Sequence, residues 1–182
     1  MIGKLLHWFY CLDFGKAALV VAACTVAFGL LDKKLRHVRW WRWLVFGALV
    51  AFVAAAIYAT IGNRGGGNNP AHAFAPFHSY REAQVTGNIE IYRSYFMNVV
   101  LFYPAGLLAT SLLPRKWPGW RRWVLVLMVL VAMSAGIEFW QYRYALGRCE
   151  IDDVIHNTAG ALLGSLAALM FSGQLAFLKK QC

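Results

Sequence analysis

The sequence predicts an all-α protein, a polytopic membrane helix bundle with about five transmembrane helices. Composition is the first reason: the 182 residues are 60% hydrophobic and only 14% charged, with a mean hydropathy of +0.51, which is unusual for a soluble domain of this length. The length of the apolar stretches is the second reason: five separate stretches approach the roughly 20 residues that a helix needs to cross a bilayer. We expect one integral membrane domain over residues 1–182, without a separable soluble part.

The predicted spans lie near residues 14–31, 44–61, 94–113, 123–142 and 154–173. The second and fourth are the clearest, whereas the third contains Asn98 and Pro104. The first is short unless Lys16 extends its ammonium group to the interface, as lysines near helix ends do. An alternative stays open for this span, because "VAAC" at 21–24 is similar to a lipoprotein cleavage box whose use would remove it. We favour an uncleaved helix, since the apolar run continues past Cys24.

The formal net charge is +10, and the positions of the basic residues decide what it means. Five Lys/Arg separate the first two predicted spans, four separate the third and fourth, and two follow the fifth. Short basic loops stay in the cytoplasm, so this pattern predicts an outer N-terminus and an inner C-terminus. The basic loops are topology signals with a secondary attraction to anionic lipid heads, and we expect no nucleic-acid partner. Tryptophans beside these loops predict an aromatic belt at the inner interface: Trp40, Trp41, Trp43, Trp117, Trp120 and Trp123.

The segment between the second and third predicted spans has two parts. Residues 62–70, "GNRGGGNNP", are rich in turn formers and predict a flexible connection. Phe74, Phe77 and Tyr80 then recur at three-residue spacing around Pro76. Two interpretations stay open for this second part. It is either an outer loop whose aromatic rings rest on the membrane interface, or a lid or re-entrant turn over a site on the outer face.

Polar residues of three predicted spans share one depth. Asn98 and Glu138 each sit four residues inside the predicted outer end of their span, and Asn157 sits four residues past Asp153 at the start of the last span. At about 1.5 Å of rise per residue, each lies about 6 Å below the outer rim. Polar groups inside a bilayer usually face the protein interior or a wet cavity. These side chains therefore predict a shared hollow near the outer surface.

Glu138 needs a partner in that hollow, because an unpaired carboxylate costs about 2–3 kcal/mol or more inside a bilayer. Arg148 is the first candidate partner and His156 is the second. Gln141 lies three residues beyond Glu138 on the same helix face, and Asp153 shares a face with His156 for the same reason. The sequence thus brings acids, amides and a histidine toward one region of the bundle.

General acid–base chemistry is one interpretation of this cluster, because burial raises the pKa of a carboxyl group and neighbouring acids push their pKa values apart. No metal site or cofactor is expected, since the spacing matches no zinc motif, although a divalent cation shared by Asp152 and His156 stays an alternative. The candidate catalytic residues are Glu138, Asp152 and Asp153, and the candidate substrate-binding residues are Asn98, Gln141, Arg148, His156, Asn157, Phe77 and Tyr80.

A structural interpretation of the same residues stays open. Asp152 and Asp153 would cap the N-terminus of a helix and complement its dipole, for about 0.3–1 kcal/mol each. The buried amides would join helices by hydrogen bonds, and Gly160 and Gly164 would form a small-xxx-small packing face. Capping alone does not explain why Glu138 lies at the depth of the two asparagines.

Three stretches, taken in order, resemble the VanZ-like family of bacterial membrane proteins: "NVVLFYPAGLL" at 98–108, "SAGIEFWQ" at 134–141 and "GRCEIDDVIHNTAGALLG" at 147–164. "APFHSY" at 75–80 resembles the Pro-Phe element that precedes the third span of that family. The resemblance implies a multi-pass protein of the bacterial cytoplasmic (inner) membrane and, through the member that named the family, a connection to resistance against the glycopeptide teicoplanin. It carries over no biochemical activity. The matching polar positions are Asn98, Glu138, Gln141, Arg148, Asp152, Asp153 and Asn157.

One cysteine departs from that resemblance. Cys149 stands where the family often has an apolar or aromatic residue. The resemblance therefore does not extend to the tip of the loop between the last two spans. The four cysteines form no paired motif. A disulfide between Cys11 and Cys149, which fall on the same predicted side, stays open.

The first functional hypothesis is a pocket in the outer leaflet that binds or modifies an anionic cell-envelope component, such as an anionic lipid or a lipid-linked precursor. Arg148 would hold the anion and Glu138 would exchange protons. The alternative is a non-catalytic membrane scaffold or binding protein whose polar residues only lock the helices together. A proton-coupled transporter is the third, and it would need polar residues that continue into the inner half of the membrane. Membrane lipids are the expected partners in each case.

Overall fold

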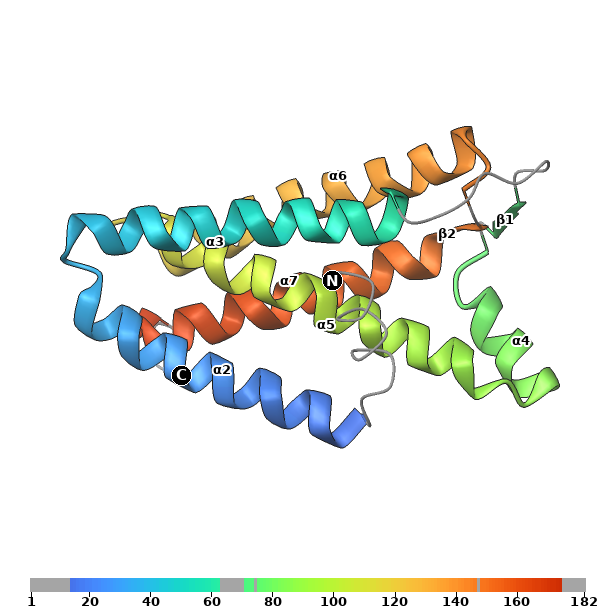
Figure 1. The fold of residues 1–182 in the computed structure, drawn as a ribbon, viewed down its shortest axis with the longest axis horizontal. Coiled ribbons are helices and arrows are strands. Elements are labelled where there is room, and N and C mark those ends of the chain that lie inside the picture. Colours follow the sequence, from blue (N-terminus) through green and yellow to red (C-terminus); the bar gives the residue numbers. More distant parts are fainter. Residues whose placement is uncertain (1–13, 63–70, 74, 147, 175–182) are drawn as a thin grey trace.

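The fold is described from a computed structural model over residues 14–62, 71–73, 75–146 and 148–174. Five long helices form the bundle: α2 (Phe14–Leu35), α3 (Arg39–Ile57), α5 (Ile89–Leu112), α6 (Gly119–Arg143) and α7 (Ile151–Phe171) (Figure 1). Helix α3 continues into a π-helical turn, η1 (Tyr58–Gly62). All five helices are long and apolar enough to cross a membrane. The predicted all-α class and the prediction of five spans are therefore confirmed.

Four of the five helices begin before the predicted apolar stretch. Helix α5 starts at Ile89, where the side chain of Asn88 accepts a hydrogen bond from the backbone N–H of Glu90 at 3.0 Å. The predicted boundaries followed the apolar residues, whereas the helical backbone continues through a polar first turn. Residues 63–70 of the predicted connection, as well as Cys11, lie outside the described residues. Helix α2 runs through Cys24 without interruption.

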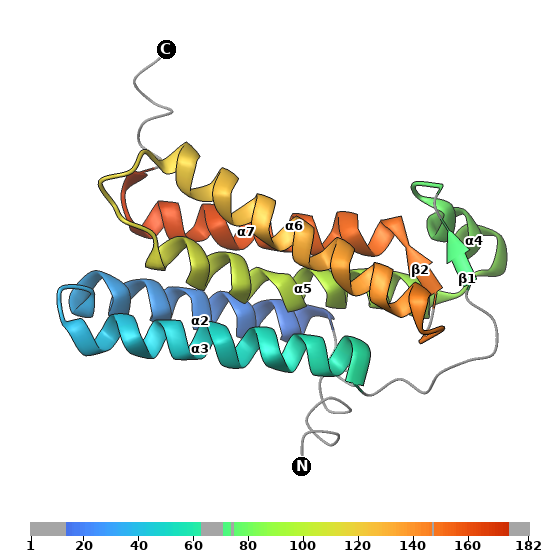
Figure 2. The same cartoon turned by 90° about the horizontal axis from the view of Figure 1, so that it is seen from above.

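Helices α5 and α7 form the centre of the bundle, as both views show (Figures 1 and 2). Helix α6 packs on α7, helix α3 packs on α5, and α2 borders both central helices. The central pair is close because glycines face the neighbouring backbone. A methyl group added to Gly164 would overlap the carbonyl oxygen of Tyr103, and one added to Gly160 would overlap that of Val99. This contact has the small-xxx-small character that the two glycines predicted.

The two ends of the bundle differ in charge. At one end, called the basic end, lie residues 32–42, which include the connection between α2 and α3, and residues 114–122, which include the connection between α5 and α6, both to the left in Figure 1. At the other, called the acidic end, lie helix α4 (His78–Thr86) and the turn between α6 and α7 (Figure 2). The sequence predicted that the two basic connections share one side, and the structure places them at one end.

A short pairing of strands ties the acidic end together and was not predicted. Strand β1 (Ala71–Ala73) pairs in parallel with β2 (Arg148–Glu150), with Ala71 opposite Arg148 and Ala73 opposite Glu150. The pairing satisfies backbone hydrogen-bonding groups that would otherwise need water. It also fixes the segment before α4 beside the turn between α6 and α7.

The tryptophans of the predicted belt do not behave alike. Trp40, Trp43 and Trp120 are exposed on the bundle surface, as an aromatic belt requires. Trp41 is buried instead, and its indole Nε1 donates a hydrogen bond to Asp32 at 3.0 Å. The prediction that Trp41 belongs to the belt is wrong, because a hydropathy pattern does not show that the indole N–H can bond to a nearby buried carboxylate.

Candidate functional site

Four elements bring polar side chains together at the acidic end. Helix α4 supplies Tyr80, and the adjoining ends of α5 and α6 supply further residues. Helix α7 supplies a row of four polar residues in its first two turns: Asp152, Asp153, His156 and Asn157. Helical spacing gives that row its shape, because residues three and four apart lie on one face. Asp152 and His156 share one face, and Asp153 and Asn157 share the next.

Asp152 fastens the segment before α4 to the bundle. Its carboxylate is 2% exposed. One oxygen accepts a hydrogen bond from the backbone N–H of Phe77 at 2.6 Å, and the other accepts one from the hydroxyl of Tyr95 at 3.4 Å. Phe77 has a φ of +59°, in the left-handed region that side chains other than glycine rarely adopt. A charge-assisted hydrogen bond at that residue helps to hold the strained turn.

His156 lies between two tyrosines. Its ring stacks on the ring of Tyr95, with centroids 4.2 Å apart and an interplanar angle of 2°. Its Nδ1 is within hydrogen-bonding distance of the carbonyl oxygen of Asp152, and its Nε2 is 2.9 Å from the hydroxyl of Tyr80. A carbonyl oxygen can only accept, so Nδ1 carries the hydrogen of the neutral ring. The Tyr80 hydroxyl then donates to Nε2.

Tyr80 stays protonated in this arrangement. Partial burial, together with the neighbouring Asp152 and Tyr92, raises the pKa of its hydroxyl above the ordinary value. The side chains of Tyr80 and His156 are only half-buried. The pair is therefore a hydrogen-bonded hydroxyl and imidazole that a molecule outside the bundle can reach.

Asp153 joins α7 to α5. Its carboxylate accepts a hydrogen bond from the side-chain amide of Asn98 at 2.7 Å, and both side chains are half-buried. Asn98 lies three residues beyond Tyr95, so one face of α5 presents both residues to α7. The two aspartates at the start of α7 therefore bond to different residues of the same helix.

The contact between α6 and α7 is more deeply buried. Glu138 is 5% exposed, and its Oε2 accepts a hydrogen bond from the backbone N–H of Glu150 at 3.0 Å. Asn157 donates its amide to the hydroxyl of Ser134 at 2.8 Å. Gln141 donates to the carbonyl oxygen of Thr60, in the π-helical turn after α3, at 3.0 Å. Among the described residues, the amide oxygens of Gln141 and Asn157 have no hydrogen-bond donor.

The predicted site residues thus divide into two groups by depth. Glu138, Gln141, Asp152 and Asn157 are buried, whereas Asn98, Tyr80, Asp153 and His156 are half-buried and Phe77 is 53% exposed. Ser134 bonds to Asn157 and lies four residues before Glu138 on α6, so Glu138 and Asn157 meet at one helix contact.

Among the described contacts, Glu138 does not bond to His156, one of its two predicted partners. The backbone of Arg148 belongs to β2, two residues before Glu150, while its side chain lies outside the described part of the structure. His156, the second predicted partner, bonds to Tyr80 and to the backbone of Asp152. A described partner of Glu138 is the backbone N–H of Glu150, which the sequence did not suggest.

Tyr95 and Ser134 belong to the cluster and were not predicted. Both could have been found from helical spacing, because Tyr95 precedes Asn98 by three residues and Ser134 precedes Glu138 by four. A tyrosine or serine in an apolar helix draws less attention than a carboxylate. The side chains nevertheless bond to Asp152 and Asn157.

Cys149 lies close to the acids of the cluster. Cys149 is buried in β2 with a free thiol, whose pKa is raised by burial and by the charges of Glu138, Asp153 and Glu150. Cys11, its predicted alternative partner, lies outside the described residues. Over those residues, no group of three or more histidine, cysteine or acidic side chains is arranged to hold a metal ion.

Fold and site together define a multi-pass α-helical membrane protein with a polar cluster at one end of its bundle. A family model described as VanZ/LLP1 matches residues 51–172, which include α4 to α7 and every residue of the cluster. The chain belongs to the VanZ/LLP1 family, so the resemblance noted in the sequence is confirmed. No curated protein and no solved structure matches the chain.

Proposed function

We propose that the acidic end binds the polar head of an anionic cell-envelope component, such as an anionic lipid or a lipid-linked precursor. The protein would lie in the bacterial cytoplasmic membrane with this end on the outer face. One observation carries the proposal: Tyr80 and His156 are hydrogen-bonded to each other, half-exposed, and held from behind by Asp152 and Tyr95. Polar groups that are fixed before a ligand arrives lose little entropy when it binds.

The pair has the chemistry to meet an anion. With a neutral His156, the Tyr80 hydroxyl donates to Nε2 and its oxygen is free to accept. When His156 takes up a proton at Nε2, the direction reverses, and the Tyr80 hydroxyl can donate to an approaching oxyanion. Asp153 on α7 and Asn98 on α5, which are hydrogen-bonded to each other and half-buried, add polar groups at the same end of the bundle.

Glu138 takes a positioning role in this proposal. Glu138 is buried and accepts a hydrogen bond from the backbone N–H of Glu150. This bond stabilises β2, the strand that also contains Arg148. The accessible Tyr80–His156 pair, and not Glu138, then exchanges protons with a ligand. Arg148 would contribute the positive charge for an anion.

Binding measurements on the purified full chain test the proposal. The melting temperature is followed against phosphatidylglycerol and undecaprenyl phosphate, with phosphatidylcholine as the uncharged comparison. Tyr80→Phe and His156→Gln should weaken the anionic-lipid shift several-fold without lowering the melting temperature of the free protein by a similar proportion. Arg81→Gln, which changes an exposed cation of α4, is the matched control. An unchanged shift in both site variants would count against the proposal.

A non-catalytic scaffold is the second candidate, and a specific observation favours it. The buried acids and amides already bond to other helices of the protein, as Asp152 does to Tyr95 and Asn157 to Ser134. In that case Asp153→Asn or Glu138→Gln would lower the amount of folded protein in proportion to any loss of phenotype. No anionic lipid would then distinguish the site variants from the wild type.

A further inference from the structure

A second polar site lies at the opposite end of the bundle. A cavity of about 130 Å³ sits there between the α2–α3 connection and the end of α5. Three arginines are among the residues that line it, Arg36, Arg42 and Arg115, together with Trp41 and Asp32. This cavity is at the basic end, far along the bundle from α4 and β2 (Figure 1).

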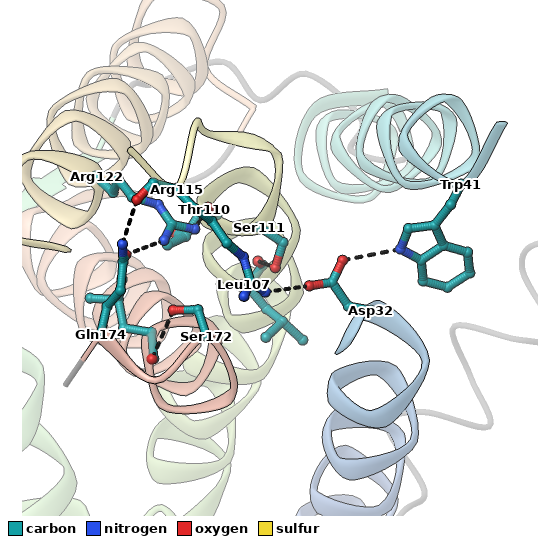
Figure 3. A network of polar contacts seen from close by, with 10 residues as sticks. Asp32, Trp41, Leu107, Thr110, Ser111, Arg115, Arg122, Ser172 and Gln174 are labelled. Atoms are coloured by element: carbon teal, nitrogen blue, oxygen red, sulfur yellow. Dashed lines mark hydrogen bonds and ion pairs between the residues drawn. The ribbon is translucent and has the colours of Figure 1, made fainter. Parts of the chain in front are cut away.

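The charge around the cavity is unbalanced. Residues 32–42 contain five Lys/Arg and residues 114–122 contain four, against one acid, Asp32. That acid is already engaged: it forms an ion pair with Arg115 at 3.1 Å and accepts the indole N–H of Trp41 at 3.0 Å (Figure 3). Arg36 has no side-chain hydrogen bond or ion pair to any described residue. Arg42 makes one hydrogen bond, to the carbonyl oxygen of Leu112 at 3.3 Å.

A buried hydrogen-bond network lies next to the cavity. Arg122 is fully buried and bonds to the side chain of Gln174 and to the carbonyl oxygen of Thr110 (Figure 3). Gln174 in turn donates to the backbone of Arg115 at 2.7 Å. These contacts connect α5, α6 and Gln174, which follows α7, and they support the backbone of Arg115.

The chemistry of the lining selects the ligand. Guanidinium groups present planar pairs of donors that match the oxygens of a phosphate. Helix α3 begins at Arg39 beside the cavity, and its N-cap residue, Val38, makes no side-chain capping bond. The first turn therefore leaves backbone N–H groups and the positive end of the helix dipole at this end of the bundle.

We propose that this cavity binds the phosphate group of an anionic membrane phospholipid, with Arg36 and Arg42 as its principal ligands. The flanking side chains favour a lipid, because Trp40 and Trp43, on either side of Trp41, are 55% and 65% exposed. Exposed tryptophans mark the level of lipid head groups. Free inorganic phosphate has the same chemistry and is the other source. The inference does not depend on the function proposed for the acidic end.

The test uses the purified full chain in a nonionic detergent. Affinities are measured for three probes: dihexanoyl phosphatidylglycerol, dihexanoyl phosphatidylcholine and inorganic phosphate. The double variant Arg36→Gln with Arg42→Gln removes two cations that line the cavity. The control, Lys34→Gln with Lys116→Gln, removes two exposed cations from the same end that do not line it. Both variants lose the same charge, so a diffuse attraction weakens equally in each.

We expect phosphatidylglycerol to bind about tenfold more weakly, or worse, to the cavity variant, and to be nearly unaffected in the control. If inorganic phosphate competes at similar concentrations and shows the same dependence on Arg36 and Arg42, the phosphate site stands and its ligand is soluble. An equal loss in both double variants, or no loss in either, overturns the proposal. Arg36→Gln alone keeps the test valid if the double variant does not fold, because the side chain of Arg36 makes no hydrogen bond or ion pair to a described residue, and its backbone bond to Asp32 is unaffected by the substitution.

Discussion

The carboxylate of Asp152 accepts the backbone N–H of Phe77 at 2.6 Å, although the two residues are 75 positions apart. This bond connects the first turn of α7 to the start of α4, where Phe77 adopts a left-handed conformation. Capping of its own helix was one of the two interpretations that the sequence left open for Asp152. The structure shows that its carboxylate also holds the segment before α4 beside the cluster, where Tyr80 lies next to His156.

Asp152→Ala should destabilise the acidic end selectively. The variant loses a charge-assisted hydrogen bond to Phe77, and hydrogen bonds to charged groups contribute about 1.5–3 kcal/mol. We expect proteolysis within residues 75–86 to accelerate, while cleavage in the connection 114–118 stays unchanged. Asp152→Asn keeps an accepting oxygen and should fall between the wild type and the alanine variant. Equal protection of residues 75–86 in all three proteins would contradict this role for Asp152.

Gly164→Ala should lower the melting temperature, because the added methyl group overlaps the carbonyl oxygen of Tyr103 on α5. Overpacking of this kind costs about 1–3 kcal/mol. Gly136→Ala is the matched control, since a methyl group at Gly136 meets no atom within 4 Å. Alanine favours a helix over glycine by about 1 kcal/mol, so the control should melt at the same or a slightly higher temperature. The account of the α5–α7 contact fails if both variants shift alike.

Asp32→Ala should destabilise the basic end more than an exposed acid does. Asp32 is 8% exposed, forms an ion pair with Arg115 and accepts a hydrogen bond from Trp41. We therefore expect the free energy of unfolding to fall by about 2–3 kcal/mol. Glu90→Ala is the comparison, because its ion pair with Arg93 at 3.6 Å is exposed. Exposed pairs contribute about 0–1 kcal/mol. Free energies of unfolding in mixed detergent micelles measure both, and equal values would show that Asp32 has no special role.

Cys149 should react slowly with alkylating reagents at neutral pH. Burial and the nearby carboxylates of Glu138, Asp153 and Glu150 raise the pKa of its thiol, so the reactive thiolate forms only at higher pH than in an unperturbed cysteine. A variant that keeps Cys149 as its sole cysteine allows the rate of iodoacetamide labelling to be followed against pH. Its midpoint should lie above the value of about 8.5 for a free cysteine. A midpoint at or below that value would be inconsistent with the described surroundings of Cys149.

The spans and the family could be predicted from the sequence because their signals are local. A run of about 20 apolar residues is sufficient to identify a membrane helix. Helical spacing also predicted that Glu138 and Asn157 approach one another, and both lie in the contact between α6 and α7. The spacing of side chains on a helix depends only on backbone geometry, so it can be predicted without knowledge of the fold.

The contacts between distant segments could not be predicted in the same way. Strands β1 and β2 are three residues long and carry no alternating pattern, so nothing local indicates that they pair. Asp32 and Trp41 are separated by a turn whose path decides whether they meet. Helical spacing places Tyr95 on one face with Asn98, but it does not show that the Tyr95 hydroxyl reaches Asp152 on another helix. In each case the deciding information is the packing of whole helices.

Photo-crosslinking tests the central claim most directly. The purified protein is mixed with an anionic lipid that carries a diazirine in its head group, irradiated, and digested for mass spectrometry. We predict that the labelled peptides include residues 75–86 and 151–160, that excess unlabelled phosphatidylglycerol removes this labelling while phosphatidylcholine does not, and that Tyr80→Phe reduces it. Labelling spread evenly over the lipid-facing helices, or unchanged by Tyr80→Phe, would contradict a built site at the acidic end.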